Sequence, residues 1–157
     1  MRSFVHGWQE TQILPRLTTS PSPRRSSWQG KINNLKCLEL CYSVVKDSHI
    51  ARLSHLPNLQ ELNLDSCLIG DWAIAHLVDH DVVPALEVLN LADTQISDNA
   101  MSKIAKLTGL RSLSLFYCNV SSRGLRHLAS MDKLESLNLD SRDIGDEGRS
   151  KSPLSVP

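Results

Sequence analysis

A six-residue leucine motif recurs five times along this chain. Each copy reads Leu-x-x-Leu-x-Leu, and the copies begin at Leu35, Leu59, Leu86, Leu110 and Leu134. The starts are 24, 27, 24 and 24 residues apart. A fixed period of this length predicts a stack of similar units, because a unit this short cannot bury its own leucines. The chain is therefore expected to form an elongated repeat domain with one continuous core.

Each unit is predicted to contain a strand, a tight turn, a helix and a return loop. If positions are numbered from the first Leu, positions 1, 4 and 6 are always leucine and position 11 is always Val or Ile. Apolar residues at positions 16 and 19 have the spacing of one helix face. Asp or Ser at position 13 is predicted to be the helix N-cap. Unit two has three extra residues near 81–84, and Val83 is expected to take its position 22.

The repeats resemble a known family. The stretch Leu-x-x-Leu-x-Leu-x-x-Cys-x-Ile-Gly-Asp at 59–71 and the stretch Leu-Glu-Ser-Leu-Asn-Leu-Asp-x-x-x-Ile-Gly-Asp-Glu-Gly at 134–148 are similar to cysteine-containing leucine-rich repeats. That subclass occurs in F-box leucine-rich-repeat proteins and in related plant-type proteins that lack an F-box. The resemblance implies an α/β fold, a right-handed leucine-rich-repeat solenoid with parallel strands on the concave face and helices on the convex face. It implies about four full repeats and a partial fifth.

Three segments are expected along the chain. Residues 1–31 carry no repeat and are basic and rich in Ser and Pro, so they are predicted to be disordered, although their composition also fits an organelle transit peptide. Residues 32–148 form the repeat domain. Residues 149–157 are predicted to be an irregular tail, because Arg149 and Ser152 stand where the repeat needs apolar residues. A last repeat without a cap exposes its leucines, so self-association through the ends is expected.

The net charge of the repeat domain excludes nucleic acid as an expected partner. The repeat domain has ten basic and sixteen acidic residues, so its formal charge is −6. Nucleic acid is not an expected partner, because its binding needs a basic track.

No run of 18 apolar residues predicts a membrane span, and the first residues do not resemble a secretory signal. Four cysteines in such a chain are expected to be free thiols in a reducing compartment, so the predicted location is the cytoplasm or nucleus.

Four cysteines and two histidines have a structural and a functional interpretation. Cys67 and Cys118 share position 9 with Ser and Thr, so a hydrogen-bonding ladder in the turn is favoured over a redox or metal role. The other two, Cys37 and Cys41, are four residues apart on a strand, roughly 13 Å, which is too far for a disulfide.

The two histidines belong to the sequence His76-Leu-Val-Asp-His80. On a helix they would lie on one face at i, i+4 and form a possible metal pair. The helix is expected to end near His80, however, so a solvated helix end is the favoured interpretation. No nucleophile–base signature and no phosphate-binding loop is present, so neither an enzymatic activity nor a cofactor is expected.

The candidate binding surface is the outward side of the strands. Positions 3, 5, 7 and 8 point away from the buried leucines, and these twenty positions contain five acids and no Lys or Arg. Its aromatic residues are candidates for binding hot spots, since Tyr is frequent at such places. The predicted contact residues are Glu39, Tyr42, Glu61, Asn63, Asp65, Asn90, Asp93, Ser114, Phe116, Tyr117, Asn138 and Asp140.

These features favour a non-catalytic protein-interaction module. Its concave face is expected to bind a protein partner with a basic or mixed-charge surface. The resemblance to F-box proteins implies an alternative, the substrate-recognition arm of a cullin-type ubiquitin ligase. Against this alternative, no F-box-like helical segment of about 40 residues precedes the repeats.

Overall fold

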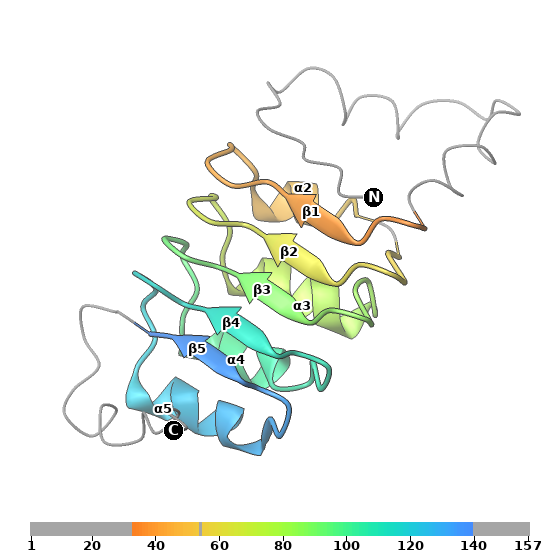
Figure 1. Ribbon diagram of the computed structural model, residues 1–157. Coiled ribbons are helices and arrows are strands. Elements are labelled where there is room, and N and C mark those ends of the chain that lie inside the picture. Colours follow the sequence, from red (N-terminus) through yellow and green to blue (C-terminus); the bar gives the residue numbers. More distant parts are fainter. Residues whose placement is uncertain (1–32, 54, 140–157) are drawn as a thin grey trace, which may run out of the picture.

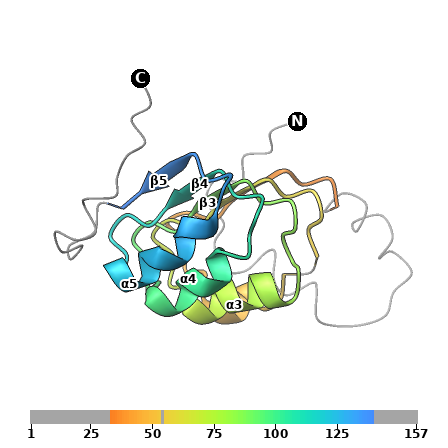
Figure 2. The ribbon, with the colours of Figure 1, turned by 90° about the horizontal axis from the view of Figure 1, so that it is seen from below.

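The fold is a single layer of parallel strands backed by helices (Figures 1 and 2). The computed structural model describes residues 33–53 and 55–139. Its elements, in chain order, are β1 (Cys37–Glu39), α2 (Asp47–Ile50), β2 (Glu61–Asn63), α3 (Asp71–Asp79), β3 (Val88–Asn90), α4 (Asp98–Ile104), β4 (Ser112–Ser114), α5 (Ser122–Leu125), the 3₁₀ helix η2 (Arg126–Ser130) and β5 (Ser136–Asn138). All helices lie on the same side of the sheet, as the repeat pattern predicts.

The strands pair in sequence order, β1-β2-β3-β4-β5, and every pair is parallel. The register matches equal repeat positions, so that Leu38, Leu62, Leu89, Leu113 and Leu137 form one row across the sheet. The three extra residues of repeat two do not disturb this row, because they lengthen α3 and the loop before β3. The predicted α/β solenoid is confirmed.

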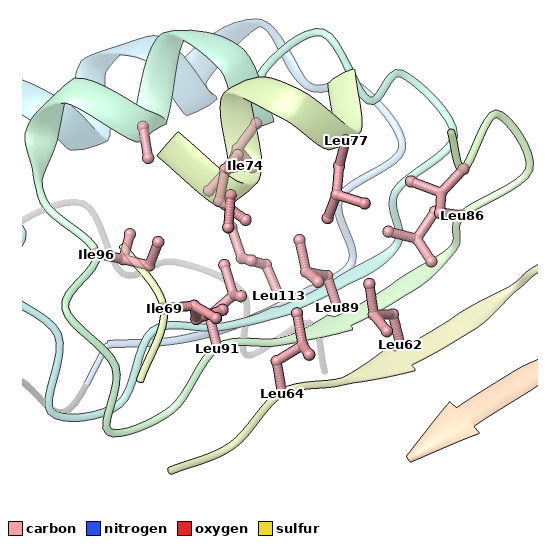
Figure 3. Packing of buried hydrophobic residues seen from close by; sticks show 14 of the residues in the cluster. Leu62, Leu64, Ile69, Ile74, Leu77, Leu86, Leu89, Leu91, Ile96 and Leu113 are labelled. Carbon is pink, nitrogen blue, oxygen red and sulfur yellow. The ribbon is translucent and has the colours of Figure 1, made fainter. Parts of the chain in front are cut away.

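The core lies between the sheet and the helices. Leucines at positions 4 and 6 of the inner repeats, such as Leu62 and Leu91, are at most 1% exposed. They point toward helix residues such as Ile74 and Leu77, and Ile69 and Ile96 close one side of the layer (Figure 3). Burial of this many aliphatic side chains is the main stabilising contribution, at about 25 cal/mol per Å² of apolar surface.

Repeat two ends as the sequence predicts. Val83 is buried, and its carbonyl accepts a hydrogen bond from Leu86 N–H at 3.3 Å. The equivalent bond in repeat one joins Leu59 N–H to the carbonyl of Leu56 at 3.2 Å. Val83 therefore takes position 22, and the extra residues lie before it in the chain.

The prediction that position 13 is the helix N-cap is wrong by one residue. Asp47, Asp71, Asp98 and Ser122 are instead the first helical residues, and the N-caps are Lys46, Gly70, Ser97 and Ser121. In the last two, the serine Oγ accepts a hydrogen bond from a backbone N–H two residues later, as a capping hydroxyl does.

The aspartates at position 13 connect neighbouring repeats instead. The Oδ1 atom of Asp47 accepts from Gly70 N–H at 2.8 Å. The Oδ1 atoms of the other two accept from the next repeat's serine N–H at 2.7 Å, and their Oδ2 atoms accept from the same serine's Oγ at 2.6 Å; the pairs are Asp71–Ser97 and Asp98–Ser121. We call Asp47, Asp71 and Asp98 the aspartate ladder. It joins repeats one to four along the start of their helices.

Candidate protein-interaction surface

The outward side of the sheet carries the predicted contact residues. We call it the strand face, which is the concave face expected from the sequence, and it consists of positions 3, 5, 7 and 8. Of these positions in the described residues, only Ala92 is buried. The strand face therefore comprises Cys37, Glu39, Cys41, Tyr42, Glu61, Asn63, Asp65, Ser66, Val88, Asn90, Asp93, Ser112, Ser114, Phe116, Tyr117, Ser136 and Asn138. Eleven of the twelve predicted contact residues are in it, and Asp140 lies outside the described residues.

The asparagines at position 5 support the backbone. Asn63 Oδ1 accepts a hydrogen bond from Asp65 N–H at 3.1 Å, and Asn90 Oδ1 accepts from Ala92 N–H at 3.0 Å. Both bonds hold the chain where it leaves its strand. The Oδ1 atoms of both asparagines are thus engaged within the fold. The strand pattern in the sequence does not reveal this role.

Two carboxylates of neighbouring repeats are linked on the strand face by one hydroxyl. Ser66 Oγ lies 2.9 Å from Asp65 Oδ1 and 3.2 Å from Asp93 Oδ2. A hydroxyl has one hydrogen to donate, so it cannot fully satisfy both carboxylates. The two acids therefore present negative charge to an approaching partner.

No described residue of the strand face is Lys or Arg. Position 2, at the edge where the strands begin, carries two cations, Lys36 and Arg111. Arg111 forms ion pairs with Glu87, at 3.8 Å, and with Glu135, the acids at the same position of the neighbouring repeats. The charge of Arg111 is therefore balanced outside the strand face.

Position 8 has an unusual backbone in every described repeat. Tyr42, Ser66, Asp93 and Tyr117 have φ angles of 55°, 55°, 50° and 57°. This left-handed conformation costs an L-residue roughly 1–2 kcal/mol, and Asp tolerates it better than a bulky side chain does. The two tyrosines are nevertheless exposed, and Tyr117 packs edge-on against Phe116 with ring centroids 4.4 Å apart.

Comparison with known families gives a clear result. A family model described as "Leucine Rich repeat" matches residues 55–71, 84–105, 106–129 and 131–151, just over half of the chain. The chain belongs to the leucine-rich-repeat family. A search of curated proteins found no match. Leucine-rich repeats indicate a protein-interaction module, in agreement with a fold that offers an extended outer surface and a filled core.

The cysteines at position 9 of this leucine-rich-repeat domain are structural, as predicted. Cys67 Sγ donates to the carbonyl of Leu40 at 3.0 Å, and Cys118 Sγ donates to the carbonyl of Leu91 at the same distance. Ser43 Oγ and Thr94 Oγ1 donate to the same two carbonyls. The four cysteines, all of them among the described residues, form no disulfide.

Burial keeps the two position-9 thiols protonated. It raises the pKa of Cys67 and of Cys118 above the ordinary value of 9.0, and this effect outweighs the hydrogen bonds from Ser43 and Thr94 that act in the opposite direction. A protonated thiol is a hydrogen-bond donor, whereas a thiolate is the nucleophile and metal ligand. The leucine-rich-repeat turn therefore uses these residues as donors.

The helix side of the domain carries cations and histidines. Lys103 Nζ lies 2.6 Å from Asp79 Oδ2, and this hydrogen bond lowers the pKa of Asp79 below its ordinary value. The α3 helix ends at Asp79, so His80 follows the helix as its C-cap, as the sequence predicts. The rings of His76 and His80 have centroids 4.5 Å apart.

The described residues also bear on metal and membrane binding. Within residues 33–53 and 55–139, no three His, Cys, Asp or Glu side chains gather closely enough to hold a metal ion. In the same described part of the chain, no helix is long and apolar enough to cross a membrane.

Proposed function

We propose that this chain binds a protein partner with a basic or mixed-charge surface on its strand face and catalyses no reaction. The observation that carries the proposal is the composition of that face. Glu39, Glu61, Asp65 and Asp93 lie on it without a described Lys or Arg, and exposed tyrosines flank the acids. Complementary charge on a partner would raise the association rate and favour one orientation.

The tyrosines at position 8 support the proposal independently of charge. Tyr42 and Tyr117 occupy a backbone conformation that Asn or Gly adopts at lower cost, yet both are bulky and exposed. Costly local conformations are common at functional sites, where the side chain is needed for contact. Tyr is also a frequent hot spot, because it combines a large apolar ring with a hydroxyl.

The proposal is tested with variants that remove charge without altering the backbone. Asp65→Asn and Asp93→Asn keep the shape of the side chain, and Asn tolerates the φ of 50° at position 93. Proteins captured from cell extract by the wild-type chain and by this double variant are compared by quantitative mass spectrometry. Capture by the variant should fall about tenfold and should lose most of its salt dependence.

Helix-side variants provide the matched control. Arg126→Gln changes an exposed charge away from the strand face, and Lys103→Gln breaks only the exposed ion pair with Asp79. Both should capture the same proteins as the wild type. If the helix-side variants are the damaging ones, the strand face is not the binding surface. Recovery of cullin subunits with the wild type would support the ligase alternative.

A further inference from the structure

The chain that leaves each strand forms a second outer surface, between the strand face and the helices. It stays extended, and the isolated parallel bridges Lys46–Leu68, Gly70–Gln95 and Ser97–Asn119 join neighbouring repeats there. Alternate residues at positions 9 and 11 are directed into the core. Position 10, between these two, is exposed in repeats one to four, as is position 14 in the first turn of the helix. Position 8, which belongs to the strand face, borders this surface.

In repeats one and two this outer surface is apolar. Tyr42 is 79% exposed, Val44 49%, Leu68 50% and Trp72 54%. We call these four residues the flank patch. They are four of the seven large apolar side chains that the described residues expose, so most of that exposure is concentrated in two adjacent repeats.

The fold itself does not require these apolar residues. Position 10 is Val44 and Leu68 in repeats one and two, but it is Gln95 and Asn119 in repeats three and four. Position 14 changes in the same way, from Trp72 in repeat two to Asn99 and Arg123 in repeats three and four. The same backbone thus accepts polar side chains at these positions. An exposed apolar cluster that the fold does not need marks an interaction site.

The flank patch is partly preorganised. The Trp72 ring stacks on the ring of His76, with centroids 5.5 Å apart and an interplanar angle of 18°. The nearby acids Asp47 and Asp71 are directed to the backbone of the following repeat in the aspartate ladder. Lys46, which is exposed between Val44 and the start of α2, gives the patch its local positive charge.

We infer that the flank patch docks an amphipathic α-helix of a partner protein, with large apolar side chains on Val44, Leu68 and Trp72 and a carboxylate directed at Lys46. The local backbone favours a helix. The bridge between Lys46 and Leu68 directs backbone hydrogen-bonding groups of these segments along the stack, so the outward surface offers side chains alone. A helix satisfies its own backbone groups and binds through one apolar face, whereas an extended peptide that adds a strand needs an exposed sheet edge for its main-chain hydrogen bonds.

The area also distinguishes between occupants. From their exposed fractions, the four side chains present on the order of 400–500 Å². A stable dimer needs about 800 Å² from each partner. A second copy bound through this patch alone would bury too little, whereas a single helix of a larger partner fits the available surface.

The probe is a phage-displayed library of peptides of about 16 residues on a helix-favouring frame, randomised along one face. The target variant Val44→Asn with Leu68→Gln introduces only residues that position 10 already holds in repeats three and four, so the fold is retained, as circular dichroism can verify. Selected peptides should carry large apolar residues at i, i+3 or i+4 and i+7 together with Asp or Glu. They should bind this variant at least about tenfold more weakly than the wild type.

The matched control is Val88→Gln, which removes an exposed apolar side chain from the strand face and should change peptide affinity less than about twofold.

In a chain carrying Trp8→Phe and Trp28→Phe, the fluorescence of Trp72 should shift to shorter wavelength on binding. The inference is overturned if no peptide is enriched, if enriched peptides lack helical spacing, or if Val44→Asn with Leu68→Gln binds them normally. It is also overturned if sedimentation shows a wild-type dimer that this variant abolishes, since the occupant is then a second copy.

Discussion

The aspartate ladder predicts a specific loss of stability on replacing Asp98 by Ala. This carboxylate accepts hydrogen bonds from Ser121 N–H at 2.7 Å and from Ser121 Oγ at 2.6 Å, across the junction of repeats three and four. A hydrogen bond to a charged group contributes about 1.5–3 kcal/mol. The low end of this range applies to each of the two bonds, because Asp98 is only half-buried and water can take the place of its carboxylate. Asp98→Ala should therefore lower the free energy of unfolding by about 2–4 kcal/mol.

The pH dependence of this effect follows from the pKa of Asp98. Burial raises that pKa, but hydrogen bonds from Ser121 and from the backbone of Gly124, together with the charge of Arg123, outweigh burial and hold it below the ordinary value of 3.8. A carboxyl whose folded pKa is depressed stabilises the fold fully above its unfolded pKa. The contribution is lost as pH falls through the folded pKa. The difference between wild type and variant should thus be constant at neutral pH and shrink below about pH 4.

Urea unfolding followed by circular dichroism measures both quantities. Asp98→Asn retains an acceptor for Ser121 N–H but no charge, so it should cost about half as much as the alanine variant. Asp132→Ala, which removes an exposed carboxylate, is the control and should stay within about 0.5 kcal/mol of the wild type. A loss for Asp98→Ala no larger than that of Asp132→Ala at pH 7 would refute the role given to the ladder.

Four further outcomes are expected. Gly124→Ala should destabilise the fold by about 1–3 kcal/mol, because its Cβ would lie 2.4 Å from Asp98 Oδ1 and 2.8 Å from a buried methionine carbon; an unchanged urea midpoint would contradict this. Tyr42→Asn should raise the melting temperature slightly by relieving the left-handed backbone and should weaken partner capture; weaker capture without higher stability would argue against strain. Deleting residues 1–30 should leave the melting temperature nearly unchanged, whereas a drop of several degrees would indicate an N-terminal cap. A capping repeat grafted after Gly148 should reduce self-association in sedimentation, unless the natural chain is already monomeric.

The repeat pattern was sufficient to predict the sheet and its core. Leucines at positions 4 and 6 lie on either side of a polar residue at position 5, and a period-two pattern specifies which side of a strand is buried. Equal spacing then fixes the register, so the row from Leu38 to Leu137 follows from counting along the chain. Even the insertion in repeat two was assigned correctly, because Val83 is the apolar residue that restores the count.

Contacts between repeats were much harder to predict. Local preference assigns Asp at position 13 to an N-cap, because capping is judged within one segment. In the structure, the carboxylate of Asp98 reaches Ser121, 23 residues away, and the capping position shifts to the preceding residue. The left-handed conformation of Tyr42 and Tyr117 was missed for a related reason. Tyr has no preference for it, so the stacked turn imposes this backbone.

The flank patch could have been found from the sequence by comparing position 10 down the repeats. Val44 and Leu68 differ in character from Gln95 and Asn119, although all four lie on one surface. The alternation that predicts the strands covers only the leucine motif, whereas position 10 belongs to the turn that follows it. Trp72 gave a weaker signal, since a tryptophan in the first turn of an amphipathic helix can equally belong to the core. Its exposure is a property of the packed helices.

The distribution of the aspartate ladder also indicates where the stack is strongest. It joins repeats one to four, but position 13 of repeat four is Ser122, which has no carboxylate. The helix of that repeat is also shorter, since α5 ends at Leu125 and continues as the 3₁₀ helix η2. Beyond this junction, Leu137 of β5 is 37% exposed, whereas its partner Leu113 in β4 is 1% exposed. Among the described residues, burial therefore falls at the junction where the carboxylates of the ladder end, and local opening should begin at β5 while the repeats joined by the ladder remain folded.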